Sequence, residues 1–226
     1  MFDKFKDLFR REDLLDDAFQ VTMKMLEFDM KMYDASRETL RETNKAELPF
    51  DIKKADRKIN KYERQVRRHV LTHLSISGTA DLVPGLVLVS IVIDVERIGD
   101  YTKNIYELAN NHPKQLQGVQ FEKKLCKIEA TIAEHFPHTL EVLKTQNKII
   151  GRQVMKAEED CSSSCDKIVN ALAQGKAKDM SVSDAVSLAM YVRYLKRINA
   201  HLTNVVSSIV NPFPRIGFRE KPKKKK

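Results

Sequence analysis

The chain is short of cysteine, glycine and proline, and each shortage excludes a class of protein. Its three cysteines, Cys126, Cys161 and Cys165, form an odd set without a disulfide framework. The opening residues, MFDKFKDLFRRED, contain no apolar signal core. Both observations predict a cytoplasmic protein with reduced thiols. Seven glycines and seven prolines in 226 residues, 42% of them hydrophobic and 31% charged, favour long helices over a β-sandwich or a disordered chain.

Long hydrophobic runs and nucleotide-binding motifs are also missing from the sequence. The longest near-apolar run, residues 82–93, contains Pro84 and Gly85 and is too short to span a bilayer, so it predicts a buried core helix. Neither G-x-x-x-x-G-K-[ST] nor G-x-G-x-x-G occurs, which excludes the common phosphate-cradling loops. The sequence contains no identifiable pairing of a nucleophile with a base. We therefore predict that the chain is not an enzyme.

The positive charge of the chain is concentrated at its C-terminus. The formal net charge is +9, but five lysines lie within residues 221–226, so the body carries only about +4. That charge is too weak to indicate a nucleic-acid-binding protein, and no nucleic-acid partner is expected. We predict that residues 214–226 form a disordered basic tail. Its candidate contacts with a partner or an anionic surface are Lys223, Lys224, Lys225 and Lys226.

Apolar residues recur at three- and four-residue spacing through nearly the whole chain, which predicts α-helices. The expected helices cover residues 14–43, 52–74, 82–110, 121–137 with a bend or break at Pro137, 139–173 and 182–210. No segment alternates with period two for long enough to form a strand. The fold class predicted is all-α, with two tandem three-helix bundles at residues 1–115 and 116–213.

The two halves resemble each other when the register is shifted by one hundred residues. The residues that coincide are Leu88, Val92, Arg97, Ile98, Asn104 and Asn111 with Leu188, Val192, Arg197, Ile198, Asn204 and Asn211. Several identities in one gapless helical register indicate an internal duplication of the bundle.

The third expected helix carries two acidic residues one turn apart, Glu96 and Asp100, with Gly99 beside them. On a helical wheel, Ile91, Val95, Ile98 and Ile105 form the stripe that faces the bundle interior. The two acids lie on another face, in line with Val89, Val92 and Ile93, so we expect them at the edge of a covered patch. Gly99 would let another helix or a ligand approach the backbone.

Paired carboxylates of this kind suit hard or borderline cations when a neighbouring helix supplies further oxygen atoms. The second expected helix offers Asp56 and Asn60, again four residues apart, with Glu63 one turn further along. The alternative is a solvated face on which Arg97 and Lys103 balance the acids. Spacing alone leaves both interpretations open.

The stretch DVERIGDYTKNI, residues 94–105, closely resembles the D-L-E-R-I-G-D-x-x-x-N-I signature of PhoU proteins, which are bacterial phosphate-signalling regulators. DRKINKYE, residues 56–63, resembles the D-x-x-I-N-x-L-E pattern on the preceding helix of that family. The resemblance implies two three-helix bundles and paired E/D-x-x-x-D motifs that hold iron or zinc clusters. Carried over to matching positions, the metal ligands would be Glu96, Asp100, Asp56 and Asn60.

The second half departs from the family pattern, because it reads LKRINAHLTNV where the family has L-E-R-I-A-D-H-A-T-N-I. Lys196 and Ala200 therefore replace both acids, and Asp166 is the remaining candidate acid on the partner helix. We expect the second bundle to keep the fold and to lack a metal cluster.

The resemblance implies a cytoplasmic regulator of phosphate transport that docks on membrane-associated partners and forms a homodimer. The implied partners are the ATPase of a phosphate ABC transporter, a sensor histidine kinase or a sodium/phosphate cotransporter. One alternative is a di-metal carboxylate enzyme, against which the missing Glu-x-x-His motif and second-half acids argue. Another is a helical nucleic-acid-associated protein, which rests on basic charge alone.

Overall fold

The computed structural model describes residues 2–45, 47–112, 114–177 and 179–220, with side chains from Leu14 onward. Within these ranges the chain forms six long α-helices, two short 3-10 helices and no strand. The helices are α1 (Phe2–Glu42), α2 (Ile52–Ser77), α3 (Leu82–Asn111), α4 (Glu122–Thr145), α5 (Lys148–Ala173) and α6 (Val182–Val210). The short ones are η1 (Val119–Phe121) and η2 (Phe213–Arg215).

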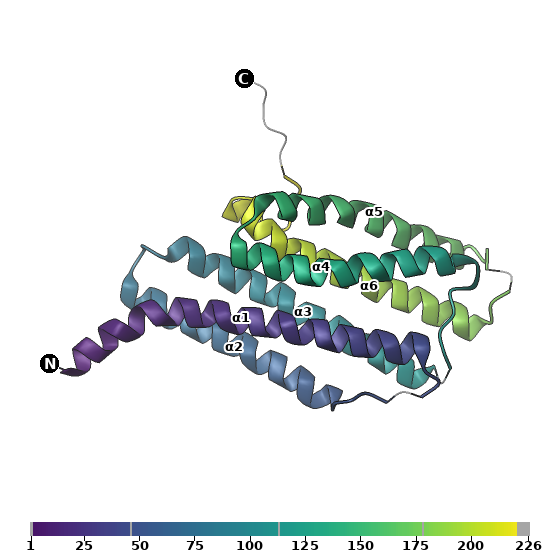
Figure 1. The fold of residues 1–226 in the computed structure, drawn as a ribbon, viewed down its shortest axis with the longest axis horizontal. Coiled ribbons are helices and arrows are strands. Elements are labelled where there is room, and N and C mark those ends of the chain that lie inside the picture. The colour runs from purple at the N-terminus through teal and green to yellow at the C-terminus, as the bar shows by residue number, and fades with distance from the viewer. Residues whose placement is uncertain (1, 46, 113, 178, 221–226) are drawn as a thin grey trace, which may run out of the picture.

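The helices form two three-helix bundles that lie side by side, α1–α3 and α4–α6 (Figure 1). Within each bundle all three helices pack on one another, and α3 also packs along α6, so the third helices form the centre of the molecule. The predicted stripe of α3, Ile91, Val95, Ile98 and Ile105, is buried in this core. The predicted all-α fold of two tandem bundles is thus confirmed.

Side chains at the helix starts explain where three of the helices begin. Asp51 accepts hydrogen bonds from the backbone N–H groups of Lys53 and Lys54, at 2.9 and 3.0 Å, and so caps α2. Asn147 caps α5 in the same way, and Ser181 caps α6 through the N–H of Asp184. These bonds satisfy backbone donors that have no partner inside the helix.

The expected break at Pro137 is wrong. Helix α4 continues through Pro137 to Thr145, and the chain turns at Gln146, whose φ of 56° and ψ of 27° are left-handed. Asn147 then caps the next helix. Proline removes one backbone donor but does not force an end to a helix that is held by tertiary packing, and Phe136 and Thr139 on either side are fully buried.

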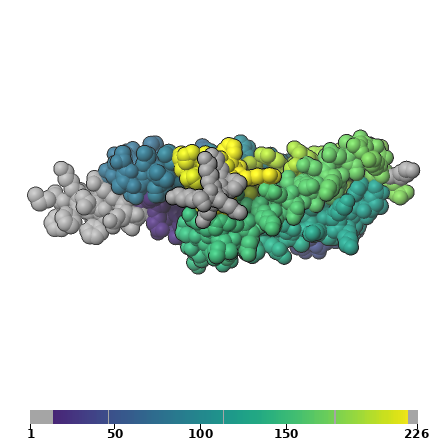
Figure 2. Space-filling model, turned by 90° about the horizontal axis from the view of Figure 1, so that it is seen from above, coloured from purple at the N-terminus to yellow at the C-terminus, as the bar shows by residue number. Residues whose placement is uncertain are grey.

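The expectation of a disordered tail from residue 214 is also wrong for the part that the structure describes. Asn211 Nδ2 donates to the carbonyl oxygens of Arg215 and Phe218, and Gly217 N donates to Ser207 Oγ at 2.7 Å. Arg152 on α5 holds Glu220 with two hydrogen bonds. Figure 2 shows this C-terminal segment, in yellow, lying against the start of α5, in green. Lys223–Lys226 lie outside the described residues.

Polar contacts join the two bundles along α3 and α6. His201 Nδ1 donates to Asp94 Oδ1 at 2.7 Å, and Asn204 Nδ2 donates to the same oxygen at 2.9 Å. Arg197 reaches across to the hydroxyl of Tyr101 at 3.2 Å.

Among the described helices, none has the length and apolar character needed to cross a membrane.

Candidate functional site

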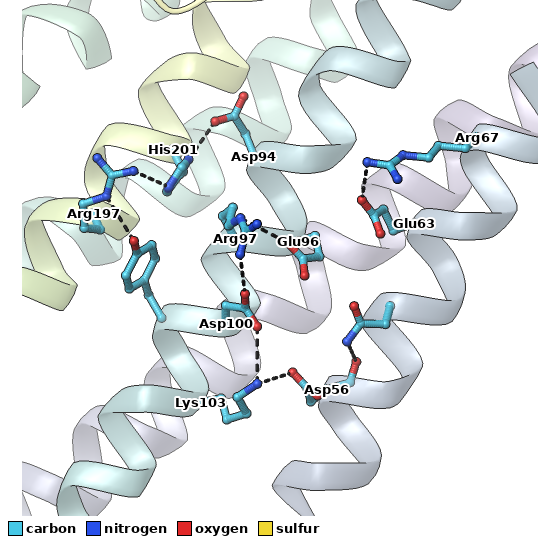
Figure 3. Close-up of polar contacts among 12 residues, drawn as sticks. Asp56, Glu63, Arg67, Asp94, Glu96, Arg97, Asp100, Lys103, Arg197 and His201 are labelled. Atoms are coloured by element: carbon cyan, nitrogen blue, oxygen red, sulfur yellow. Dashed lines mark hydrogen bonds and ion pairs between the residues drawn. The ribbon is translucent and has the colours of Figure 1, made fainter.

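The acidic residues of α3 face those of α2 across the outside of the first bundle (Figure 3). Glu96 and Asp100 project from α3, and Asp56 and Glu63 project from α2, each partly buried with 13 to 27% of its side chain exposed. This is the predicted position at the edge of a covered patch. One neighbour differs from expectation, because Val92 is buried whereas Ile93 is 40% exposed.

Two basic residues of α3 connect these carboxylates. Lys103 Nζ lies 2.8 Å from Asp56 Oδ1 and 3.3 Å from Asp100 Oδ1, so it bridges the two helices. Arg97 contacts the other oxygen of Asp100 at 2.9 Å and Glu96 at 3.6 Å. The amide of Asn60 turns away from this network, since its Nδ2 donates to the backbone oxygen of Asp56 at 3.1 Å.

The carboxylates are close enough to raise the free energy of one another's ionised forms. Burial, followed by the negative charge of Asp100, raises the pKa of Glu96 above its usual range. Burial opposes the charge of Lys103, but its hydrogen bond to Asp56 and the nearby charges of Asp56 and Asp100 raise the pKa of its ammonium group. Glu63, the fourth carboxylate of the face, pairs with Arg67 of α2 at 2.7 Å.

A further carboxylate, which sequence reasoning missed, lies behind this face. Asp29 on α1 is fully buried, and neither of its carboxylate oxygens has a hydrogen-bond partner among the described residues. Burial, and then the charges of Glu96 and Asp100, raise the pKa of Asp29 well above its usual value. Gly99 makes the approach possible, because a Cβ atom there would lie only 2.9 Å from Asp29 Oδ1 and 2.7 Å from Ile59 Cδ1. In the sequence, Gly99 indicated that another group could approach the backbone of this helix, but it did not show that this group is Asp29.

In this arrangement the predicted metal ligands do not converge on one point. No three Asp, Glu, His or Cys side chains within the described ranges are placed to hold a metal ion. Lys103 and Arg97 bind the carboxylates instead, as the alternative of a charge-balanced face expected. The assignment of Glu96, Asp100, Asp56 and Asn60 as metal ligands stays a prediction.

The corresponding face of the second bundle is built differently. Lys196, at the position of Glu96, lies 2.6 Å from Asp166 on α5. Ala200, at the position of Asp100, lines a cavity of about 490 Å³ between α5, α6 and the C-terminal segment. Arg219 of that segment pairs with Glu159 of α5 at 2.9 Å. Cations of the chain itself thus neutralise the acids of this face.

An apolar groove lies at the end of the molecule where α3 begins. It has a volume of about 750 Å³ and is lined by side chains from α1, α3, the end of α4 and the end of α6. Leu15, Phe19, Val83, Val87 and Ile209 provide much of its apolar lining. Val83 in this lining is 57% exposed.

The architecture defines a class of protein, namely an all-helical protein of two bundles with the PhoU fold. PhoU from Pseudomonas aeruginosa superposes with a TM-score of 0.79 at 18% identity, over 88% of this chain and 96% of that one. The phosphate transport system regulatory protein PhoU from Streptococcus pneumoniae gives a TM-score of 0.69 at 15% identity, over 89% and 94%.

The sequence comparisons agree with the fold. Residues 22–109 match the PhoU domain family. The phosphate-specific transport system accessory protein PhoU homolog of Synechocystis sp. is 24% identical over 173 residues, which are 74% of this chain and 75% of that protein. Residues 22–109 thus match a PhoU domain, as the resemblance of DVERIGDYTKNI predicted.

Proposed function

We propose that this protein regulates phosphate transport and phosphate-responsive signalling by docking on other proteins, not by catalysis. The similar proteins support this function, since the Synechocystis relative is named an accessory protein of a phosphate transport system and the S. pneumoniae protein a regulatory one. The observation that carries the docking mechanism is the apolar groove at the start of α3. Monomeric proteins rarely leave a contiguous apolar surface open unless it binds something.

The groove has the features of a recognition site for a helix or loop of a partner. Its wall combines the apolar side chains of α1 and α3 with polar groups at one edge, where His73 lies 2.9 Å from Asp81. The exposed side chain of Val83 in this lining would be covered in a complex. We propose that the partner is a component of the phosphate transport machinery at the cytoplasmic face of the membrane. The protein itself would be cytoplasmic and a homodimer.

Binding assays with purified partners test this function. The three candidates are the ATPase of a phosphate ABC transporter, a sensor histidine kinase and a sodium/phosphate cotransporter in detergent. The variant Val83→Glu/Val87→Glu places two charges in the groove, and we expect at least a tenfold loss of affinity for the true partner.

The matched control changes the other end of the molecule. Val182 and Val186 at the start of α6 are 81% and 54% exposed, whereas the groove is lined by the opposite end of that helix, at Ser208 and Ile209. Val182→Glu/Val186→Glu should leave partner affinity unchanged. Docking through this groove is wrong if both double variants bind alike, and the transport function is wrong if none of the three candidates binds the wild-type protein.

We also propose that the acidic face of the first bundle binds iron or zinc. The chemistry of the donors supports this, because carboxylate oxygens from two facing helices suit hard and borderline cations. The unpartnered Asp29 behind the face is a further reason to expect a cation. Lys103 and Arg97 would have to release the carboxylates on binding. Elemental analysis of wild-type protein beside Glu96→Ala/Asp100→Ala should find metal in the wild type only, and equal, negligible metal in both would reject the site.

A further inference from the structure

We propose that the end of the molecule where α1 and α3 begin binds directly to the surface of an anionic lipid bilayer, with the apolar face of residues 2–11 entering the head-group region. The inference goes beyond the docking on protein partners proposed above, because it needs no other protein. It rests on the sequence of the first turns of α1, on exposed apolar side chains at the neighbouring helix ends and on the course of the C-terminal segment.

The first turns of α1 have the pattern of an amphipathic helix. Residues 2–11 read FDKFKDLFRR, and their backbone is helical. At about 100° per residue, Phe2, Phe5 and Phe9 fall on one face of this helix, and Leu8 falls at the edge of that face. Figure 1 shows the start of α1, in purple, extending past the ends of the other helices. We therefore expect a binding partner, and not the bundle, to cover this apolar face.

This apolar face does not continue the face that α1 buries in the bundle. Ala18 and Met25 belong to the buried face and are fully covered. Counted back from Ala18 at three- and four-residue spacing, the buried face passes through Arg11, Asp7 and Lys4. The three phenylalanines thus lie on the opposite side of the helix, where packing within the first bundle does not explain them.

The charges of the segment are arranged around its apolar face. Four basic residues border the face on both sides, namely Lys4, Lys6, Arg10 and Arg11. Asp3 and Asp7 lie opposite it, and Glu12 falls on the face and marks its end. An apolar face bordered by cations is complementary to a bilayer whose surface is negative and whose interior is apolar. This charge pattern favours an anionic lipid surface over the apolar groove of another protein.

Exposed apolar side chains gather at the same end of the molecule. The lining of the apolar groove shows that the start of α3 and the ends of α2, α4 and α6 meet near the start of α1. The exposed apolar side chains on these helix ends, and on the start of α5 that follows α4, are Ile76, Leu82, Val83, Leu86 and Ile149. Contact with the bilayer would remove part of this apolar surface from water.

The C-terminal segment leads to this end as well. Glu220 accepts two hydrogen bonds from Arg152, in the second turn of α5. Five of the six residues that follow Glu220 are lysines. A short interfacial helix binds a membrane weakly unless a second signal acts with it, and a run of lysines supplies such a signal on an anionic surface.

Co-sedimentation of the full chain with lipid vesicles tests the proposal. The wild type should bind vesicles of phosphatidylcholine and phosphatidylglycerol, mixed at about three to one, at least tenfold more tightly than vesicles of phosphatidylcholine alone. Phe5→Glu/Phe9→Glu should weaken binding to the anionic vesicles at least tenfold. The matched control is Val182→Glu/Val186→Glu, which makes the same kind of change at exposed positions on the start of α6 and should bind like the wild type.

A second variant separates lipid binding from misfolding. Lys6→Gln/Arg10→Gln keeps the apolar face and removes two of its bordering charges, so its affinity for anionic vesicles should fall about tenfold. Its affinity for phosphatidylcholine alone should not change. Equal midpoints of thermal unfolding for the wild type and the variants show that the fold is intact.

A tryptophan reporter separates insertion of the helix from electrostatic attraction at a distance. The chain contains no tryptophan, so Phe9→Trp introduces a single fluorophore on the apolar face. Its emission should shift to shorter wavelength when anionic vesicles are added, and brominated lipids should quench it. The emission of Val182→Trp should stay unchanged.

Lipid docking is wrong if the wild type binds neither kind of vesicle, or if Phe5→Glu/Phe9→Glu binds anionic vesicles as tightly as the wild type. An emission shift of Phe9→Trp that follows protein concentration and not vesicle concentration would assign the apolar face to a second copy of the chain instead. The vesicles contain no protein, so each of these results is independent of the binding assays with phosphate-transport proteins.

Discussion

The two bundles solve the same electrostatic problem in different ways. In the first, the acids of α2 and α3 are held by Lys103 and Arg97, and Asp29 is left without a partner behind them. In the second, Lys196 and Arg219 neutralise Asp166 and Glu159, and the interior His135 donates a hydrogen bond to Asn199. Duplicated bundles can share a core and differ at one face, because residues at that face contribute little to the core. The two bundles thus share a register in the core and differ in the residues of this polar face.

The largest loss of stability is expected when Arg41 is substituted, because this residue of the first bundle forms ion pairs with the second. Its guanidinium contacts the carboxylates of Glu122 and Glu129 on α4 and the carbonyl of Leu116, and only 7% of its side chain is exposed. Arg41→Ala would leave Glu129 buried without its cation, so we expect a loss of about 3–5 kcal/mol in the free energy of unfolding. Urea denaturation measures this loss.

Arg37→Ala on the same helix is the control for Arg41, because its ion pair with Glu42 is partly exposed. It should cost no more than about 1 kcal/mol. Equal losses for the two variants would show that the contact between the bundles is not held by the buried arginine.

The second-largest loss of stability is expected when Asn199 is substituted. Asn199→Ala removes the acceptor of His135 and leaves a buried imidazole N–H unsatisfied, which should cost about 1–3 kcal/mol in urea denaturation. Asp29→Leu in the first bundle should act in the opposite direction. Destabilisation by both variants would contradict the difference drawn between the two interiors.

A smaller effect distinguishes the two bridging lysines. Lys103→Met removes the cation that competes for Asp56 and Asp100, so the affinity for Mn²⁺ should rise about tenfold, or roughly 1.4 kcal/mol. Lys196→Met in the second bundle should leave Mn²⁺ affinity unchanged, because Ala200 supplies no carboxylate there. Calorimetric titration measures the Mn²⁺ affinity of both variants. If affinity rose in Lys196→Met and not in Lys103→Met, the cation would bind in the second bundle, which would contradict the proposal.

The smallest effects are opposite responses of the two interiors to pH. Burial raises the pKa of Asp29, so the folded state binds more protons than the unfolded state above about pH 3.8, and this residue lowers stability as pH rises. Burial lowers the pKa of His135, so this residue lowers stability as pH falls through about 6.5. Each group carries one proton, so neither slope can exceed about 1.4 kcal/mol per pH unit.

Unfolding free energies at several pH values, compared with those of variants, measure these slopes. Asp29→Asn should remove the decline with rising pH, and His135→Gln should remove the decline below pH 6.5. The assignment of the pH dependence to these two groups would be wrong if both variants kept the wild-type slopes.

Much of the fold could be predicted because helical periodicity records which face of each helix is buried. The stripe of Ile91, Val95, Ile98 and Ile105 was predicted in the core and lies there. The edge position of Glu96 and Asp100 followed from the same wheel. The helix break at Pro137 was predicted wrongly, since a local rule about proline was applied where buried neighbours hold the helix together. The cap at Asn147 was the better signal.

The sequence by itself determined the two-bundle helical fold, the resemblance to PhoU proteins, and the loss of both acids from the second half. Only the tertiary structure decided that Asp29 faces Gly99, that Lys103 bridges Asp56 and Asp100, and that the segment around Gly217 and Arg219 covers α5 and α6. The physical reason is that periodicity specifies how each helix turns its faces but not which residue of another helix it meets. That choice depends on how the helices pack, and this packing brings the buried carboxylate of Asp29 on α1 next to Gly99 of α3.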